Sequence, residues 1–220
     1  MPSQRPKITV GELYHVFNRS VEGRTVFPTQ KHYERFLAAM RFFNTTDAVT
    51  LREFFVSVKT GVQPLQKLDT KALVEVGAFI LMPTHYHFLL RPLVEDGISL
   101  FMQKMGSGYT CFFNLKHGRT GPLFQGRYKV KHIDSDRYAR HIQAYIPLNA
   151  LDYIMPEWRE SGIKDKRKAY KLLLEHPWSS FSSYIGENRF QGIIDQKFIL
   201  DFFDGTKDFE QSMISWSAKD

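Results

Sequence analysis

The feature that most constrains the fold is the stretch FILMPTHYHFLLR, which runs from Phe79 to Arg91. Its apolar residues indicate two strands, at 74–81 and 86–91. Pro83 separates them, because a proline cannot donate a hydrogen bond within a central ladder. Two strands joined by so short a turn predict an antiparallel hairpin. Two histidines, His85 and His87, stand at the start of its second strand.

The spacing of these histidines suggests a metal site. Successive side chains of a strand point to opposite faces, so His85 and His87 share one face. A single histidine on an apolar strand is usually a packed core residue, whereas two side by side at a strand end favour a pair of metal ligands. A third ligand must then come from another part of the chain.

Length and composition place the chain among ordinary globular proteins. Its 220 residues are enough for one domain with a real core. No apolar run approaches the roughly 20 residues that a membrane helix needs, and we expect no signal segment and a cytoplasmic protein. The single cysteine, Cys111, cannot form an internal disulfide.

The net charge of +7 points to a polyanionic partner, because much of it is concentrated in one region. Aromatic residues among these charges, Phe124 and Tyr128, favour nucleic acid, since they can stack on unpaired bases. A solvated basic face is the alternative. The basic residues of this region are Lys116, Arg119, Arg127, Lys129, Lys131, Arg137 and Arg140.

The order of the expected elements predicts an α+β fold with a ferredoxin-like antiparallel sheet. Apolar periodicity indicates strands at 12–18 and 127–133 in addition to the hairpin, and helices at 31–43, 97–115 and 136–146. Residues 1–150 form the expected core, with an insertion at about 44–70 that ends in a mobile loop. Within it, 51–56 fits a helix or a strand. Residues 151–220 are expected to add helices and a frayed tail.

Six segments, in this order, resemble one protein family and span about residues 11 to 185. The family is that of the REP-associated tyrosine transposases, IS200-like members of the HUH group of single-strand endonucleases. The matching segments are Tyr14-His-Val-Phe-Asn-Arg19, Leu81-Met-Pro-Thr-His-Tyr-His87, Gly108-Tyr-Thr110 with Phe113-Asn114, Arg119-Thr-Gly-Pro-Leu-Phe-Gln-Gly-Arg-Tyr-Lys129, Tyr145-Ile-Pro-Leu-Asn149 and Trp178-Ser-Ser180.

The resemblance implies metal-assisted cleavage of single-stranded DNA by a tyrosine nucleophile. The metal-binding histidines of the family fall on His85 and His87, and its nucleophile falls on Tyr109. The asparagine usual in the turn is Thr84 here. Relatives often complete the metal shell with a polar residue one turn beyond the tyrosine, for which Asn114 is the candidate. The implied ion is Mg²⁺ or Mn²⁺.

Tyr109 lies on the buried stripe of the expected helix 97–115, which fits a core tyrosine as well as a nucleophile. From the side of the helix that faces the sheet, it is expected to point at the histidine pair. Cys111 is the rival nucleophile, but it lies about 200° round the helix from Tyr109 and faces away.

Four basic residues are the expected phosphate contacts: Arg119, Arg127, Lys129 and Lys131. The last three are expected to share one strand face and to line a single groove. Their alternative is a solvated charged face. The roles of His15 and Asn18, on the first strand, stay undecided between the site and packing.

The leading functional hypothesis is a transposase that nicks single-stranded or hairpin DNA through a 5′-phosphotyrosine intermediate, as a monomer or a homodimer. One alternative is a hairpin-DNA-binding protein that does not cut. A weaker alternative is a metal-dependent phosphodiesterase with water as the nucleophile.

Overall fold

The computed structural model describes residues 6–60, 71–187, 189–195, 197–198 and 201–216. Its sheet has four strands in the order β2-β3-β1-β4, and every neighbouring pair is antiparallel. The helices α1 and α2 lie between β1 and β2 in the chain, and the helix α3 connects β3 to β4. This is the ferredoxin-like arrangement, as predicted. The bounds are Leu13–Arg19 for β1, Gln30–Phe43 for α1, Val74–Met82 for β2, His85–Pro92 for β3, Gly97–His117 for α3 and Lys129–Ile133 for β4.

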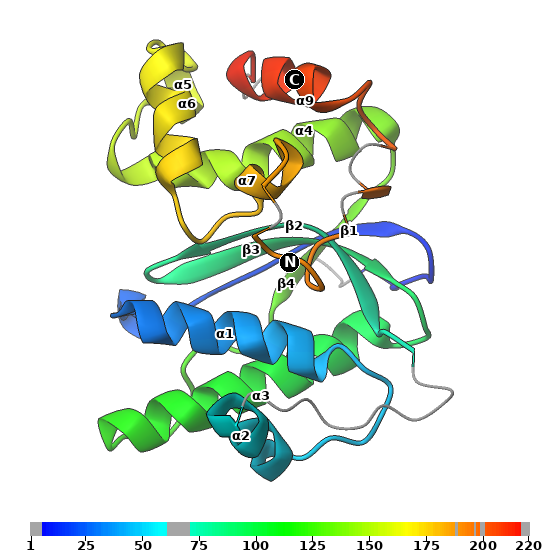
Figure 1. Cartoon of the computed structure of the whole chain (residues 1–220), viewed down its shortest axis with the longest axis vertical. Helices are drawn as coiled ribbons and strands as arrows, with labels where there is room; N and C mark the ends of the chain where they lie inside the picture. Colours follow the sequence, from blue (N-terminus) through cyan, green and yellow to red (C-terminus); the bar gives the residue numbers. More distant parts are fainter. Residues whose placement is uncertain (1–5, 61–70, 188, 196, 199–200, 217–220) are drawn as a thin grey trace.

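The sheet lies between two layers of helices (Figure 1). On one side are α1, α2 (Leu51–Thr60) and α3. On the other side α4 (Asp136–Leu148) lies along the sheet and the C-terminal helices pack around it. The remaining elements are η1 (Val21–Gly23), η2 (Asn149–Tyr153), α5 (Trp158–Ser161), α6 (Lys166–Glu175), α7 (Phe181–Tyr184) and α9 (Thr206–Ile214).

Each face of the sheet has its own apolar cluster, because side chains alternate along the strands. Tyr86, Phe88 and Leu90 of β3 belong to the cluster beneath α1 and α3. Leu89 belongs to the cluster beneath α4 and the C-terminal helices. Even-numbered residues of β3 therefore pack against α1 and α3, and the odd-numbered Leu89 packs against α4 and the C-terminal helices.

The turn between β2 and β3 is held by the chain that follows β1. The carbonyl of Thr84 accepts from the Ser20 amide at 2.8 Å, and the carbonyl of Pro83 accepts from the Val26 amide at 2.7 Å. These bonds fix the backbone directly before His85.

The helix α4 begins where the sequence indicated. Ser135 is its N-cap, and its hydroxyl accepts from the Tyr138 amide at 3.3 Å. The helix was expected to end at Pro147, but it runs to Leu148, with the proline in its last turn. The segment that follows continues as η2.

The insertion is described in part. Residues 51–56, which fitted a helix or a strand, belong to the helix α2. Residues 61–70, where a loop was expected, lie outside the described residues. Within the described part of the chain, no helix is long and apolar enough to cross a membrane.

A C-terminal segment lies against the outer edge of β2. The Leu81 amide donates to the Trp178 carbonyl and the Ser180 amide donates to the Phe79 carbonyl, each at 2.9 Å. Ser179 makes the β-bridge between them, to Ile80. This edge of the sheet is therefore covered by the chain itself.

Candidate active site

His85 and His87 point to the same face of the sheet, as predicted, and that face is the one beneath α4. In the register, His85 is opposite Arg19 and His87 is opposite Phe17. The two imidazole rings are 5.3 Å apart between centroids, nearly perpendicular to one another.

Both imidazoles are oriented through their Nδ1 atoms. The Nδ1 atom of His87 is 2.9 Å from Nε2 of His15, and the Nδ1 atom of His85 is 3.0 Å from the hydroxyl of Thr84. With the proton on Nδ1, each imidazole donates to its neighbour and leaves Nε2 for a metal ion. Thr84 thus orients the ring of His85.

The protonation state of the pair also suits a cation. Burial lowers the pKa of His85 to about 4, with the charge of Arg19 adding to the effect. Burial, together with the neighbouring imidazoles of His15 and His85, holds the pKa of His87 well below its usual value. Metal ligands must be neutral imidazoles, so the two residues fit a divalent ion at neutral pH.

The histidine pair is not a complete metal shell. Within the described residues, no group of three or more His, Cys, Asp and Glu side chains is placed to hold a metal ion. An ion bound to the pair would therefore take its other ligands from an amide, water or a substrate phosphate.

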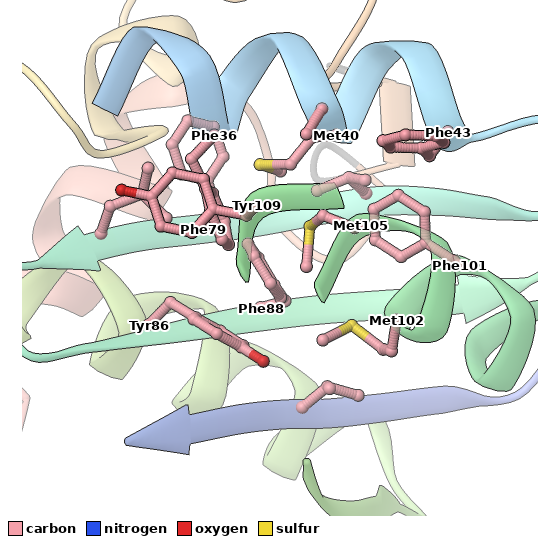
Figure 2. Close-up of a cluster of buried hydrophobic side chains, with 14 of the residues drawn as sticks. Phe36, Met40, Phe43, Phe79, Tyr86, Phe88, Phe101, Met102, Met105 and Tyr109 are labelled. Atoms are coloured by element: carbon pink, nitrogen blue, oxygen red, sulfur yellow. The ribbon is translucent and has the colours of Figure 1, made fainter. Parts of the chain in front are cut away.

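Tyr109 does not face the histidines, so that prediction is wrong. Its side chain is fully buried on the opposite face of the sheet, and its hydroxyl donates to the Val26 carbonyl at 2.6 Å. Figure 2 shows it in the apolar cluster with Phe36 and Met40 of α1. Burial also raises the pKa of the phenol, which makes it a poorer nucleophile. The physical reason is that α3 packs on the face to which Tyr86 points.

Asn114 and Arg119 hold a turn instead of joining the site. The Asn114 amide donates to the Gly121 carbonyl at 2.9 Å and accepts from Arg119 at 2.6 Å. Arg119 also donates to the Pro122 carbonyl. Asn114 is on α3, on the side of the sheet away from the histidines, so its expected role as their third metal ligand is wrong.

A different tyrosine, Tyr145 of α4, lies over the histidine face. Its ring meets the ring of His15 at 6.0 Å and that of His87 at 6.1 Å between centroids, both edge-on. Its hydroxyl accepts a hydrogen bond from Arg159 at 2.8 Å. The tyrosine is half-buried, so it is within reach of solvent beside the pair.

Arg159 connects Tyr145 to the segment that follows it. The guanidinium forms an ion pair with Asp152 at 2.9 Å and donates to the Asn149 side chain at 2.7 Å. It also stacks over the rings of Trp158 and Tyr145, at 4.5 and 5.0 Å from their centroids. This network fixes the position of the Tyr145 hydroxyl.

Two of the predicted phosphate ligands border the site. Lys129 is opposite Phe17 in the sheet and Lys131 is opposite His15, so both exposed lysines share the histidine face. Arg127 lies before β4 and lines a groove beside α3. The expected common face therefore holds for the lysines and not for Arg127.

Sequence reasoning missed Tyr145 and Arg159 and left His15 open. A usable signal was present for Tyr145, because Tyr145-Ile-Pro-Leu-Asn149 places a polar residue one turn beyond a tyrosine on the helix after β4. For His15, the signal was its position on β1, two residues before Phe17 and four before Arg19. Side chains two apart on a strand share a face, so all three lie on the face of the histidine pair. Arg159 had no comparable signal.

The fold and the site define an α+β protein of ferredoxin-like topology, with a histidine pair and a tyrosine on the sheet face opposite α1 and α3. Among solved structures, the chain is similar to a REP-associated tyrosine transposase bound to a REP hairpin, with a TM-score of 0.53 and 14% sequence identity. The match covers 89% of this chain and 94% of that chain. No protein-family model and no curated protein sequence matches. At this identity the similarity establishes the fold.

Proposed function

We propose that this protein cuts single-stranded DNA at a hairpin repeat and joins itself to the 5′ phosphate through Tyr145. One observation carries the proposal: Tyr145 from α4 and the histidine pair from β3 meet on the same face of the sheet. This replaces Tyr109 as the nucleophile.

The reaction follows from the groups present. The Tyr145 oxygen attacks the scissile phosphorus, its phenolic proton is lost to solvent, and the bond from phosphorus to the 3′ oxygen breaks. The 3′ oxygen takes up a proton and leaves as a hydroxyl. One phosphoester replaces another, so no nucleotide is consumed. The freed 3′ hydroxyl can attack the phosphotyrosine and reverse the step, or a different 3′ hydroxyl can attack in its place.

His85 and His87 would hold the metal ion, Mg²⁺ or Mn²⁺, through Nε2. When bound, it would neutralise charge on the scissile phosphate and align that phosphate for attack. Asn149, one turn beyond Tyr145, is the candidate for a third ligand through the side-chain oxygen that now accepts from Arg159.

Arg159 would orient the nucleophile. The hydrogen bond from Arg159 to the Tyr145 hydroxyl and its stacking on the Tyr145 ring restrict the orientation of the phenol. A nucleophile held in the correct orientation reacts faster in an in-line displacement. The guanidinium is partly exposed beside the hydroxyl, so it can also contact a phosphate oxygen.

Two features support DNA as the substrate. Lys129 and Lys131 are exposed on the histidine face at the edge of the sheet, where a phosphate backbone can follow them. The similar solved structure is of a transposase bound to a REP hairpin.

The test is a comparison of two conservative variants, Tyr145→Phe and Tyr109→Phe. A hairpin labelled at its 3′ end is incubated with the protein and Mn²⁺, then denatured and separated by electrophoresis. The parent protein and Tyr109→Phe should give a labelled protein band, and Tyr145→Phe should give none while still binding the hairpin.

The other outcomes select the alternatives. An adduct that persists in Tyr145→Phe would overturn the assignment of the nucleophile. Cutting without an adduct in the parent protein would identify a hydrolase, and binding without cutting would identify a non-cleaving hairpin-DNA-binding protein.

A further inference from the structure

A second pair of histidines lies where the first turn of α1 meets the last turn of α3. The Nε2 atom of His32 is 3.0 Å from the Nε2 atom of His117, although 85 positions separate the two residues in the chain. Both helices lie on the side of the sheet opposite α4, and the start of α1 contacts the end of α3 (Figure 1). We call His32 and His117 the α1-α3 histidine pair.

The ring of His32 is oriented from its other side by Thr29. Its Nδ1 atom is 2.8 Å from the Thr29 hydroxyl, and its backbone amide donates to the Thr29 carbonyl at 2.9 Å. With the proton on Nδ1, the imidazole donates to that hydroxyl and directs the lone pair of Nε2 at His117. Proteins orient metal-binding histidines in the same way, through a hydrogen bond from the other ring nitrogen.

The two histidines differ in their access to solvent. His32 is only 1% exposed, and its ring lies 5.6 Å from that of Phe112 and 5.8 Å from that of Phe113, between centroids. His117 is exposed, and its ring lies 4.3 Å from that of Phe113. An ion can therefore reach the pair from the surface and meet one imidazole that is already fixed in position.

The spacing of the two nitrogens is close to that of a metal site. Two nitrogens bound to one Zn²⁺ ion at the tetrahedral angle are about 3.3 Å apart, since each lies about 2.0–2.1 Å from the ion. The observed separation is 3.0 Å, so the nitrogens need to move apart by about 0.3 Å. A small rotation of the exposed His117 ring would achieve this and would let both lone pairs converge on the ion.

The protonation state of His32 also suits an ion. Burial lowers its pKa to about 4, with the charges of Lys116 and His117 adding to the effect, so the imidazole is neutral at pH 7, as a metal ligand must be. The charge of Lys116 opposes a second cation, but its ammonium group lies over the ring of Phe112, 5.6 Å from the centroid. Imidazole nitrogen suits zinc, copper and nickel ions, whereas Mg²⁺ takes oxygen ligands.

We propose that the α1-α3 histidine pair binds a divalent transition-metal ion of the zinc type through both Nε2 atoms. Within residues 6–60, 71–187, 189–195, 197–198 and 201–216, no group of three or more His, Cys, Asp and Glu side chains is placed to hold a metal ion, so water would fill the other positions. The bound ion would connect α1 to α3 and stabilise the folded chain. This site is independent of the proposed reaction, because His85 and His87 lie on the other face of the sheet.

The test compares His117→Gln with Lys116→Gln. The glutamine at position 117 removes one ligand, keeps a side-chain amide that can donate to His32, and occupies an exposed position, so the variant should fold. Lys116→Gln is the matched control, since it changes the neighbouring exposed residue and leaves both imidazoles in place.

The first measurement is the number of Zn²⁺ ions bound per chain, by titration calorimetry at pH 7.5 with Mg²⁺ in excess. The parent protein should bind one more ion than His117→Gln does. Lys116→Gln should bind as many ions as the parent, and at least as tightly, because a like charge has been removed.

The second measurement is urea denaturation in EDTA and at a free Zn²⁺ concentration ten times the Kd found by calorimetry. An ion at that concentration raises the ratio of folded to unfolded protein about tenfold. The rise from EDTA to Zn²⁺ should therefore be about tenfold larger for the parent than for His117→Gln. Any stabilisation by an ion at His85 and His87 is present in both proteins and drops out of the comparison.

Three results would overturn the inference. Equal numbers of bound ions in the parent and His117→Gln would mean that the two rings only share a hydrogen bond. Loss of the ion in Lys116→Gln as well would mean that the imidazoles are not its ligands. An ion that is lost in His117→Gln without any difference in stabilisation would bind His117 alone and would not connect the helices.

Discussion

The burial of His15 should make folding stability depend on pH as the pH falls below about 6.5. Its imidazole is buried against His87, and burial, with the charge of Lys131, lowers its pKa from 6.5 to about 3. The unfolded chain binds a proton below pH 6.5 and the folded chain does not, so stability is full above pH 6.5 and is lost as pH falls. At pH 5 the loss from this one residue is about 2 kcal/mol.

His15→Gln tests this value. A glutamine at this position keeps an acceptor for the Nδ1 proton of His87 and removes the titrating group. Between pH 7.5 and 5, the parent protein should lose about 2 kcal/mol more unfolding free energy than the variant does. Most carboxylates titrate below this window, so they contribute little to the difference.

Urea denaturation at 25 °C in EDTA, at half-unit steps of pH, gives both curves. Parallel curves for the two proteins would refute the reasoning, because they would mean that the folded protein protonates His15 as readily as the unfolded chain. His132→Gln is the control for the removal of a histidine from β4, since His132 is exposed.

Three further outcomes are expected. Tyr109→Phe should lower the unfolding free energy by about 1–3 kcal/mol, measured in urea, because the Val26 carbonyl loses its buried donor, and DNA cutting should be unchanged. Arg159→Met should slow adduct formation roughly tenfold or more in single-turnover assays and leave hairpin affinity in EDTA nearly unchanged, and an unaltered rate would remove Arg159 from the mechanism. Lys131→Glu should weaken hairpin binding and reduce the slope of log affinity against log salt by about 0.7–0.9, whereas Lys171→Glu on α6 should not.

The fold could be predicted from the sequence because its signals are local. The proline between two apolar runs defines the β2-β3 hairpin, and period-two alternation sets the common face of His85 and His87. Apolar periodicity likewise identifies α1 and α3. The sheet order then follows from the few topologies that these elements allow.

The proposed nucleophile could not be placed in the same way, because periodicity shows that Tyr109 is buried and does not show against which face. That depends on the handedness of the crossovers, which puts α1 and α3 together on the face of Tyr86. Arg159 was beyond prediction for another reason. Its contacts with Tyr145 and Asp152 depend on the path of η2 and α5, for which the sequence has no strong period.

The covered edge of β2 has a consequence for how copies of this chain can associate. Trp178 and Ser180 already take the backbone groups that a further strand would need on that side. The other edge, β4, has only five residues and carries the exposed Lys129 and Lys131, and short, charged edges resist pairing with a second sheet. The sheet is therefore protected from growing by strand addition. The charged edge stays open to a polyanion.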